Sequence, residues 1–209
     1  MYTLRNIVCT LASALALTAG AQNEAMPNYA IMPTPGYTPI YSVINGTVGW
    51  TFQPTTEISV TALGAFANLP SGVEIGLWNS SGALLASDTI TSASTAVGLS
   101  LYQSITPVML QADQTYYIAA YNPGGAFQTV VLGEGLNPPD GTALMSPYIQ
   151  LGNAADANNG TFQFPNVVDG PTDTAIIGAN FEFQPVPEPA TLALGGIGAL
   201  FLLAARRRR

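Results

Sequence analysis

Four side chains near the middle of the chain are of the types that contact sugars, namely Glu74, Trp78, Tyr117 and Tyr121. Successive side chains of a strand point to opposite faces, so Glu74, Gly76 and Trp78 share one face if the apolar residues between them face a core. There the indole would stack on a sugar ring, Gly76 would let the ring approach, and Glu74 would accept hydroxyl hydrogens. The two tyrosines would extend this surface if their apolar neighbours point inward. The competing interpretation is that Trp78 packs beneath a loop or fills the end of the predicted sandwich, because tryptophan is highly buried on average.

Carboxylates offer a second chemistry, the hydrolysis of glycosides. Such catalysis needs two carboxylates roughly 5–10 Å apart and neither histidine nor lysine. Asp169 and Asp173 flank a turn at Gly170-Pro171, although solvated loop acids explain both without catalysis. Because sequence cannot bring any chosen pair together, a carbohydrate-active enzyme that uses paired carboxylates is kept as the alternative to a binding protein.

Among metals, calcium remains open. Zinc and copper sites normally use His or Cys, and the chain has no His and one Cys, Cys9. Calcium takes carboxylate and carbonyl oxygens, which the segment Asp156–Gly160 could offer. That segment lacks the spaced acids and distal Glu of an EF-hand loop, so a flexible loop is favoured. We therefore expect no metal site and no cofactor.

The distribution of charge excludes several further functions. The chain has five Lys and Arg residues in total, and Arg5 and Arg206–Arg209 account for all of them. No cationic side chain therefore lies between these two ends. Nucleic-acid binding requires cations that displace counterions from phosphate, and a Ser-His-Asp triad requires histidine. We expect a non-catalytic binding or structural protein.

Short apolar runs that alternate with polar residues recur about every ten residues, which is typical of an antiparallel all-β domain. The predicted strands cover residues 47–52, 58–66, 73–77, 83–91, 99–105, 108–110, 115–121, 126–132 and 175–183. Asn79–Gly82 has turn residues that predict a hairpin between two of these strands. Trp50 is assigned to the core because it shares a face with Val48 and Phe52. The pattern predicts a β-sandwich or jelly roll.

The predicted sandwich spans residues 40–184. Residues 22–39 are expected to form a mobile lead-in, and a linker is expected to begin at residue 185. Within the domain, residues 137–141 and 152–160 are rich in turn formers and are expected to be loops.

The N-terminus has the three parts of a secretory signal peptide over residues 1–21. Arg5 supplies the positive charge, residues 7–18 form a short apolar centre, and Ala19-Gly20-Ala21 forms an A-x-A cleavage pattern. We expect signal peptidase to cut after Ala21. That cut removes Cys9 and leaves the exported domain without a thiol.

An uncharged apolar segment, Ala190–Ala205, precedes the arginines Arg206–Arg209 at the C-terminus. As a helix it would span about 24 Å, which flanking residues and local thinning can match to a bilayer core of roughly 30 Å. The arginines would stay cytoplasmic by the positive-inside rule. The domain is therefore expected outside, anchored transiently in the inner membrane.

The sequence Val186-Pro187-Glu188-Pro189, followed by that apolar segment and the terminal arginines, closely resembles the PEP-CTERM protein-sorting signal of Gram-negative bacteria. In that family an exosortase, a membrane transpeptidase-like enzyme, recognises the tail and cleaves it near the Pro-Glu-Pro. Carriers tend to be surface or matrix proteins of bacteria that make exopolysaccharide. The resemblance implies that Pro187, Glu188 and Pro189 form the processing motif of a sorting signal over residues 185–209, with an exosortase-like enzyme as partner.

Two runs inside the domain, Val60–Gly64 ("VTALG") and Gly76–Ala86 ("GLWNSSGALLA"), resemble a β-sandwich domain of unknown function found in bacterial surface proteins. The resemblance extends from about Tyr37 to Phe183. It implies the fold and no activity.

These observations together predict a secreted protein of the cell envelope or extracellular surface that is sorted by an exosortase-like system. It is expected to be non-catalytic, to contact exopolysaccharide, and to bind no nucleic acid.

Overall fold

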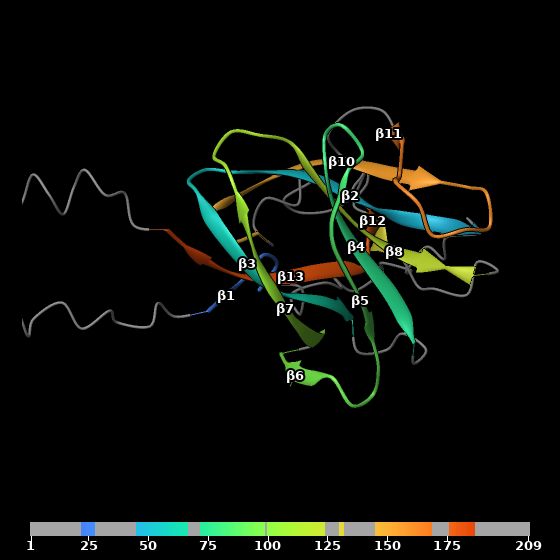
Figure 1. The fold of residues 1–209 in the computed structure, drawn as a ribbon, viewed down its shortest axis with the longest axis horizontal. Coiled ribbons are helices and arrows are strands. Elements are labelled where there is room, and N and C mark those ends of the chain that lie inside the picture. Colours follow the sequence, from blue (N-terminus) through green and yellow to red (C-terminus); the bar gives the residue numbers. More distant parts are fainter. Residues whose placement is uncertain are drawn as a thin grey trace, which may run out of the picture.

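A computed structural model describes residues 22–27, 45–66, 72–98, 100–123, 130–131, 145–168 and 176–186. The described residues form two antiparallel sheets that pack face to face, with a separate two-stranded pair (Figure 1). All the elements of the described residues are strands. The predicted all-β antiparallel sandwich is confirmed.

The larger sheet carries the candidate site. Its strands lie in the order β11 (Val167–Val168), β10 (Ile149–Ala157), β2 (Gly46–Pro54), β8 (Tyr116–Asn122), β4 (Val73–Asn79) and β5 (Leu84–Ile90). The predicted turn at Asn79–Gly82 joins β4 to β5, and the amide N–H of Gly82 donates 3.0 Å to the carbonyl of Asn79.

The smaller sheet contains the strands nearest both ends of the described chain. Its order is β1 (Asn23–Glu24), β13 (Ala179–Pro185), β3 (Ile58–Phe66), β7 (Ser100–Leu110) and β6 (Thr95–Val97). The additional pair consists of β9 (Val130–Val131) and β12 (Ile176–Ile177). β1 and β13 are hydrogen-bonded neighbours, so the first and last described strands lie side by side (Figure 1).

The core forms where the two inner faces meet. Trp50 and Phe52 from β2 are fully buried against Phe181 from β13, with Phe52 and Phe181 ring centroids 4.7 Å apart. The indole N–H of Trp50 donates 2.9 Å to the carbonyl of Ala179, which satisfies the polar atom of a buried ring and joins the sheets. The assignment of Trp50 to the core is confirmed.

The predicted mobile lead-in is wrong for residues 22–26. Asn23–Glu24 pairs with β13, and Ala25 and Met26 are buried in the core. The amide N–H of Ala25 donates 2.9 Å to the carbonyl of Phe181. The strand has only two residues, so no alternating pattern could reveal it, and it is stabilised by the neighbouring strand.

The boundary of the predicted linker also moves. Pro185 belongs to β13, and the amide N–H of Val186 donates 2.9 Å to the carbonyl of Glu57. The fold therefore extends to the residue before Pro187. A third difference lies in β7, which continues through Thr106 and Pro107 where two separate strands were predicted. A register shift in the β3–β7 pairing accommodates the proline.

The predicted loop at residues 152–160 is wrong in its first part. Residues up to Ala157 belong to β10, which pairs along β2. Gly, Asn, Asp and Ala are all depleted in strands, so this segment is extended because of its pairing rather than its composition.

Several predictions fall on residues outside the described ranges. These are the signal-peptide residues Ala19 and Ala21, the motif Pro187, Glu188 and Pro189, the apolar segment 190–205, and Arg206, Arg207, Arg208 and Arg209. Within the described ranges, no helix is long and apolar enough to cross a membrane.

Candidate functional site

The predicted sugar-contacting side chains come from two neighbouring strands of the larger sheet. Glu74 and Trp78 lie on β4, Tyr117 and Tyr121 lie on β8, and Trp78 pairs directly with Tyr117. The residues between them face the core as predicted, since Val73, Ile75, Leu77, Tyr116 and Ile118 all belong to the buried cluster. The four side chains therefore share the outer face of this sheet.

Trp78 is not an exposed platform on that face. Only 2% of its surface is exposed, because Phe162 covers it at a centroid distance of 5.3 Å and Phe164 packs at 6.5 Å. Both phenylalanines belong to the segment that follows β10. The prediction of an open stacking surface at Trp78 is therefore wrong, and the competing interpretation, a tryptophan beneath a loop, describes the structure.

The same segment also engages Tyr121. The Tyr121 hydroxyl donates 2.7 Å to the carbonyl of Gly160, and the amide N–H of Gln163 donates 2.9 Å to the Thr47 hydroxyl. Residues 158–166 therefore form a strap across the outer face. Glu74 is half-buried on β4, where it pairs with Thr89 of β5.

Gly76 was predicted to let a sugar ring approach the strand, but the indole of Trp78 occupies that position. A Cβ atom at Gly76 would overlap the indole of Trp78. The bare backbone therefore lets the indole lie flat on its own strand, and no room is left there for a sugar.

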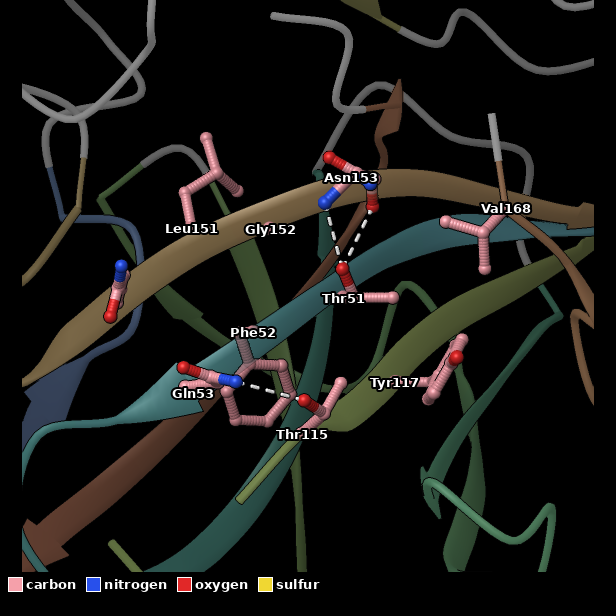
Figure 2. A pocket seen from close by; sticks show the side chains of 10 residues that line it. Thr51, Phe52, Gln53, Thr115, Tyr117, Leu151, Gly152, Asn153 and Val168 are labelled. Carbon is pink, nitrogen blue, oxygen red and sulfur yellow. Dashed lines mark hydrogen bonds between the residues drawn. The ribbon is translucent and has the colours of Figure 1, made fainter. Parts of the chain in front are cut away.

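A pocket of about 330 Å³ lies on the same outer face of the larger sheet, next to Tyr117 (Figure 2). Among the described residues, ten line it: Thr51, Phe52, Gln53, Thr115, Tyr117, Gln150, Leu151, Gly152, Asn153 and Val168. Tyr117 is the one predicted contact residue among them, and its ring is held edge-on by Phe164 at 4.8 Å. Tyr117 thus lies at the pocket and also packs against the strap, whereas Trp78 and Tyr121 contact the strap and do not line the pocket.

A β-bulge shapes one wall of the pocket. Leu151 pairs with Phe52 and Ala154 pairs with Trp50, so two residues of β10, Gly152 and Asn153, face the single residue Thr51 of β2. A bulge of this kind redirects a side chain and leaves one residue out of the ladder.

The Thr51 side chain holds that bulge in place. Its hydroxyl accepts a 2.7 Å hydrogen bond from the amide N–H of Asn153 and donates 3.3 Å to the carbonyl of the same residue (Figure 2). A Cβ atom at Gly152 would overlap the Thr51 hydroxyl oxygen. Because residue 152 is a glycine, the Thr51 hydroxyl can come close enough to bond the backbone of Asn153.

The amide oxygen of Asn153, Oδ1, is buried and accepts no hydrogen bond from the described residues. On the β2–β8 side of the pocket, the Gln53 amide donates 3.0 Å to the Thr115 hydroxyl. The lining thus combines amides, hydroxyls, an aromatic ring and aliphatic groups, and none of the ten described lining residues is charged. Sequence reasoning missed every pocket residue except Tyr117. The signal it could have used is Gly152, because an isolated glycine inside a strand indicates a bulge.

A pair of carboxylates lies on the other sheet. Glu24 and Glu182 face each other in the β1–β13 pairing, and the Tyr102 hydroxyl donates 2.8 Å to Glu24 while the Gln22 amide donates 2.7 Å to Glu182. Burial, and then the charge of Glu24, raise the pKa of Glu182. Burial and the hydrogen bond to Glu24 also raise the pKa of Tyr102.

The other acids considered from sequence are Asp156, Asp169 and Asp173. Asp169 and Asp173 lie outside the described residues. Asp156 is a buried residue of β10 rather than part of a loop, and the described part of the chain has no group of three or more acidic, His or Cys residues that could hold a metal ion.

Comparison with known proteins matches residues 34–181 to a family described as a domain of unknown function (DUF4082). Residues 185–209 match the PEP-CTERM protein-sorting motif. No curated protein and no solved structure gives a significant match. A PEP-CTERM motif indicates a secreted protein that an exosortase-like enzyme sorts to the cell envelope or surface. The chain therefore belongs to the DUF4082 family and is an exosortase substrate.

Proposed function

We propose that this protein is a non-catalytic component of the cell surface or extracellular matrix that binds exopolysaccharide. The observation that carries the proposal is the pocket on the outer face of the larger sheet, whose described lining residues are all uncharged and include Tyr117. Polysaccharides present hydroxyl groups and apolar ring faces, which amides, hydroxyls and aromatic rings recognise. The pocket volume of about 330 Å³ falls at the small end of the range of about 300–1,000 Å³ common for ligand sites.

The two proposed cleavage sites lie just outside the first and last described strands. Signal peptidase would cut after Ala21, and the first strand begins at Asn23. The exosortase-like enzyme would act near Pro187, and the last strand ends at Pro185. Both cuts would fall outside the sheets, so maturation would release an intact sandwich. Before the second cut, residues 190–205 would anchor the chain in the inner membrane.

Retention on polysaccharide tests the binding role. The processed protein, recovered from the cell surface, is passed over immobilised exopolysaccharide of the producing strain, and the expected result is retention of the wild type. Tyr117→Ala should reduce retention at least fivefold, whereas Tyr148→Ala, a change on an exposed ring outside the pocket, should not. Unretained wild-type protein would contradict the proposal.

A reducing-sugar assay tests the non-catalytic role. The same protein, incubated with the same polysaccharide, should release no new reducing ends above the level of a heat-denatured sample. Release that depends on a carboxylate residue would establish the alternative, a carbohydrate-active enzyme.

A further inference from the structure

We infer that Gln22 and Thr61 form an intramolecular ester, a covalent cross-link that ties the residue before β1 to β3 with loss of ammonia. The two side chains are already in contact, since the Gln22 amide nitrogen donates 2.8 Å to the Thr61 hydroxyl oxygen. This site lies on the smaller sheet and the pocket lies on the larger one, so the inference is independent of polysaccharide binding.

The contact places a nucleophile beside an electrophile. Thr61 supplies a hydroxyl group, and the side-chain amide of Gln22 supplies a carbonyl carbon, Cδ. An amide C–N bond is about 1.33 Å long, so a hydroxyl oxygen in contact with the amide nitrogen lies no farther than about 4.1 Å from Cδ. Reacting atoms need to approach to about 3–3.5 Å. A small movement of either side chain therefore brings the hydroxyl oxygen to the carbon that it would attack.

A carboxyl group contacts the nitrogen that would leave. Glu182 on β13 accepts a 2.7 Å hydrogen bond from the same Gln22 nitrogen, because β13 lies between β1 and β3. A carboxylate in this position can take a proton from the attacking hydroxyl and pass it to the leaving nitrogen. Burial, and then the charge of Glu24, raise the pKa of Glu182, which makes its carboxylate a stronger base. Glu182 is therefore assigned as the catalytic residue.

The reaction needs no other reagent. The Thr61 oxygen attacks Cδ of Gln22, and its proton passes to Glu182 while the new C–O bond forms. The tetrahedral intermediate then expels the amide nitrogen, which takes the proton back from Glu182 as the C–N bond breaks. The products are an ester between the two side chains and one molecule of ammonia, and Glu182 is regenerated. Ammonia diffuses away, whereas the hydroxyl is held in place by the fold, so the ester is favoured.

Such a cross-link would replace the disulfide that this chain cannot form. The chain has one cysteine, Cys9, so no disulfide can form within it. The ester would close a loop between residues that are 39 positions apart and would span β13, the strand that leads to the sorting motif. A covalent link of this kind restricts the unfolded chain and thereby stabilises the fold.

The mass of the processed protein, recovered from the cell surface, tests the inference. Wild type should be lighter than its amino-acid sequence requires by about 17 Da, the mass of one ammonia. Chymotryptic digestion and fragmentation should give one branched peptide in which Gln22 is joined to Thr61. A wild-type protein whose peptides contain an unmodified Gln22 would overturn the inference.

Three variants assign the atoms. Thr61→Val keeps the shape of the side chain without its hydroxyl, and it should abolish the branched peptide. Thr61→Ser restores a hydroxyl, and it should restore the branched peptide. Glu182→Gln should reduce the cross-linked fraction at least tenfold in freshly recovered protein, because proton transfer by a positioned side chain typically contributes about 10²–10⁴-fold. Circular dichroism confirms that each variant is folded.

Gln53 and Thr115 provide a matched control. Their side chains are of the same two types and lie 3.0 Å apart, and no described carboxylate contacts the Gln53 amide. Thr115→Val should therefore leave the mass deficit unchanged. Loss of the deficit in this variant would place the ester at the other pair and overturn the assignment to Gln22 and Thr61.

One competing reaction gives the same mass. Cleavage after Ala21 would leave Gln22 at the amino terminus, where its own amine can attack Cδ and form a five-membered lactam, also with loss of ammonia. A deficit of about 17 Da that persists in folded Thr61→Val, without a branched peptide in wild type, would identify this lactam and overturn the inference. A folded Glu182→Gln protein that is cross-linked as fully as wild type would overturn the catalytic role of Glu182.

Discussion

The indole of Trp78 lies on the bare backbone of Gly76, two residues earlier in the same strand. The ring is closed off from above by Phe162 and Phe164. This contact explains why a glycine stands two residues before Trp78 in β4. The ring lies between its own strand and the two phenylalanines, so it is not exposed.

Gly76→Ala should destabilise the fold by about 1–3 kcal/mol, because the added methyl group must displace a ring that has no free space around it. Urea denaturation gives the free energy of unfolding. Gly178→Ala is the matched control, since a Cβ atom at Gly178 meets no atom of the described residues within 4 Å, and it should be neutral or stabilise by up to about 1 kcal/mol. Equal effects of the two changes would contradict the packing described here.

Trp78→Ala should cost about 3–5 kcal/mol of stability, the range for removal of a large buried aromatic ring. The loss reflects the cavity beneath Phe162 rather than any contact with a ligand. Circular dichroism in urea measures it without dependence on tryptophan fluorescence. A change below about 1 kcal/mol would show that the strap does not cover this ring in solution.

Tyr102→Phe should destabilise the protein by about 1–3 kcal/mol. The Tyr102 hydroxyl donates 2.8 Å to the Glu24 carboxylate and accepts 2.7 Å from the Asn180 amide, so its removal leaves both groups short of a partner. Tyr148→Phe, on a ring at the surface, is the matched control and should have little effect. Thermal unfolding of both variants at neutral pH provides the comparison.

Glu182→Gln should alter how stability depends on pH. The folded state raises the pKa of Glu182 through burial and then through the charge of Glu24, so the folded protein holds this proton at a pH where the unfolded chain has released it. The contribution of Glu182 to the free energy of unfolding therefore falls as pH rises from the unfolded pKa, near 4.5, to the higher pKa of the folded state. Above the folded pKa this contribution no longer changes with pH.

Unfolding at several values of pH from 3.5 to 7.5 checks this prediction. The wild type should lose stability relative to Glu182→Gln as pH rises through that window. A difference that is constant, or that changes in favour of the wild type, would contradict the raised pKa.

The amino-acid sequence by itself determined the class of fold and the destination of the protein. Alternation in runs such as 73–77 places Val73, Ile75 and Leu77 in the core, because the side-chain period of a strand is a local property of the backbone. The Asn79–Gly82 turn and the Pro187-Glu188-Pro189 motif can likewise be recognised from adjacent residues. Each of these signals lies within a few positions along the chain.

Only the tertiary structure decided what the outer face of the larger sheet presents. The strap after β10 covers Trp78, the two-residue strand β1 is held by β13, and the bulge at Gly152-Asn153 exists only in register with Thr51. All three depend on pairing between segments far apart in sequence. Strand register and the packing of one segment over another are non-local, so the pocket could not be predicted from any single run of residues.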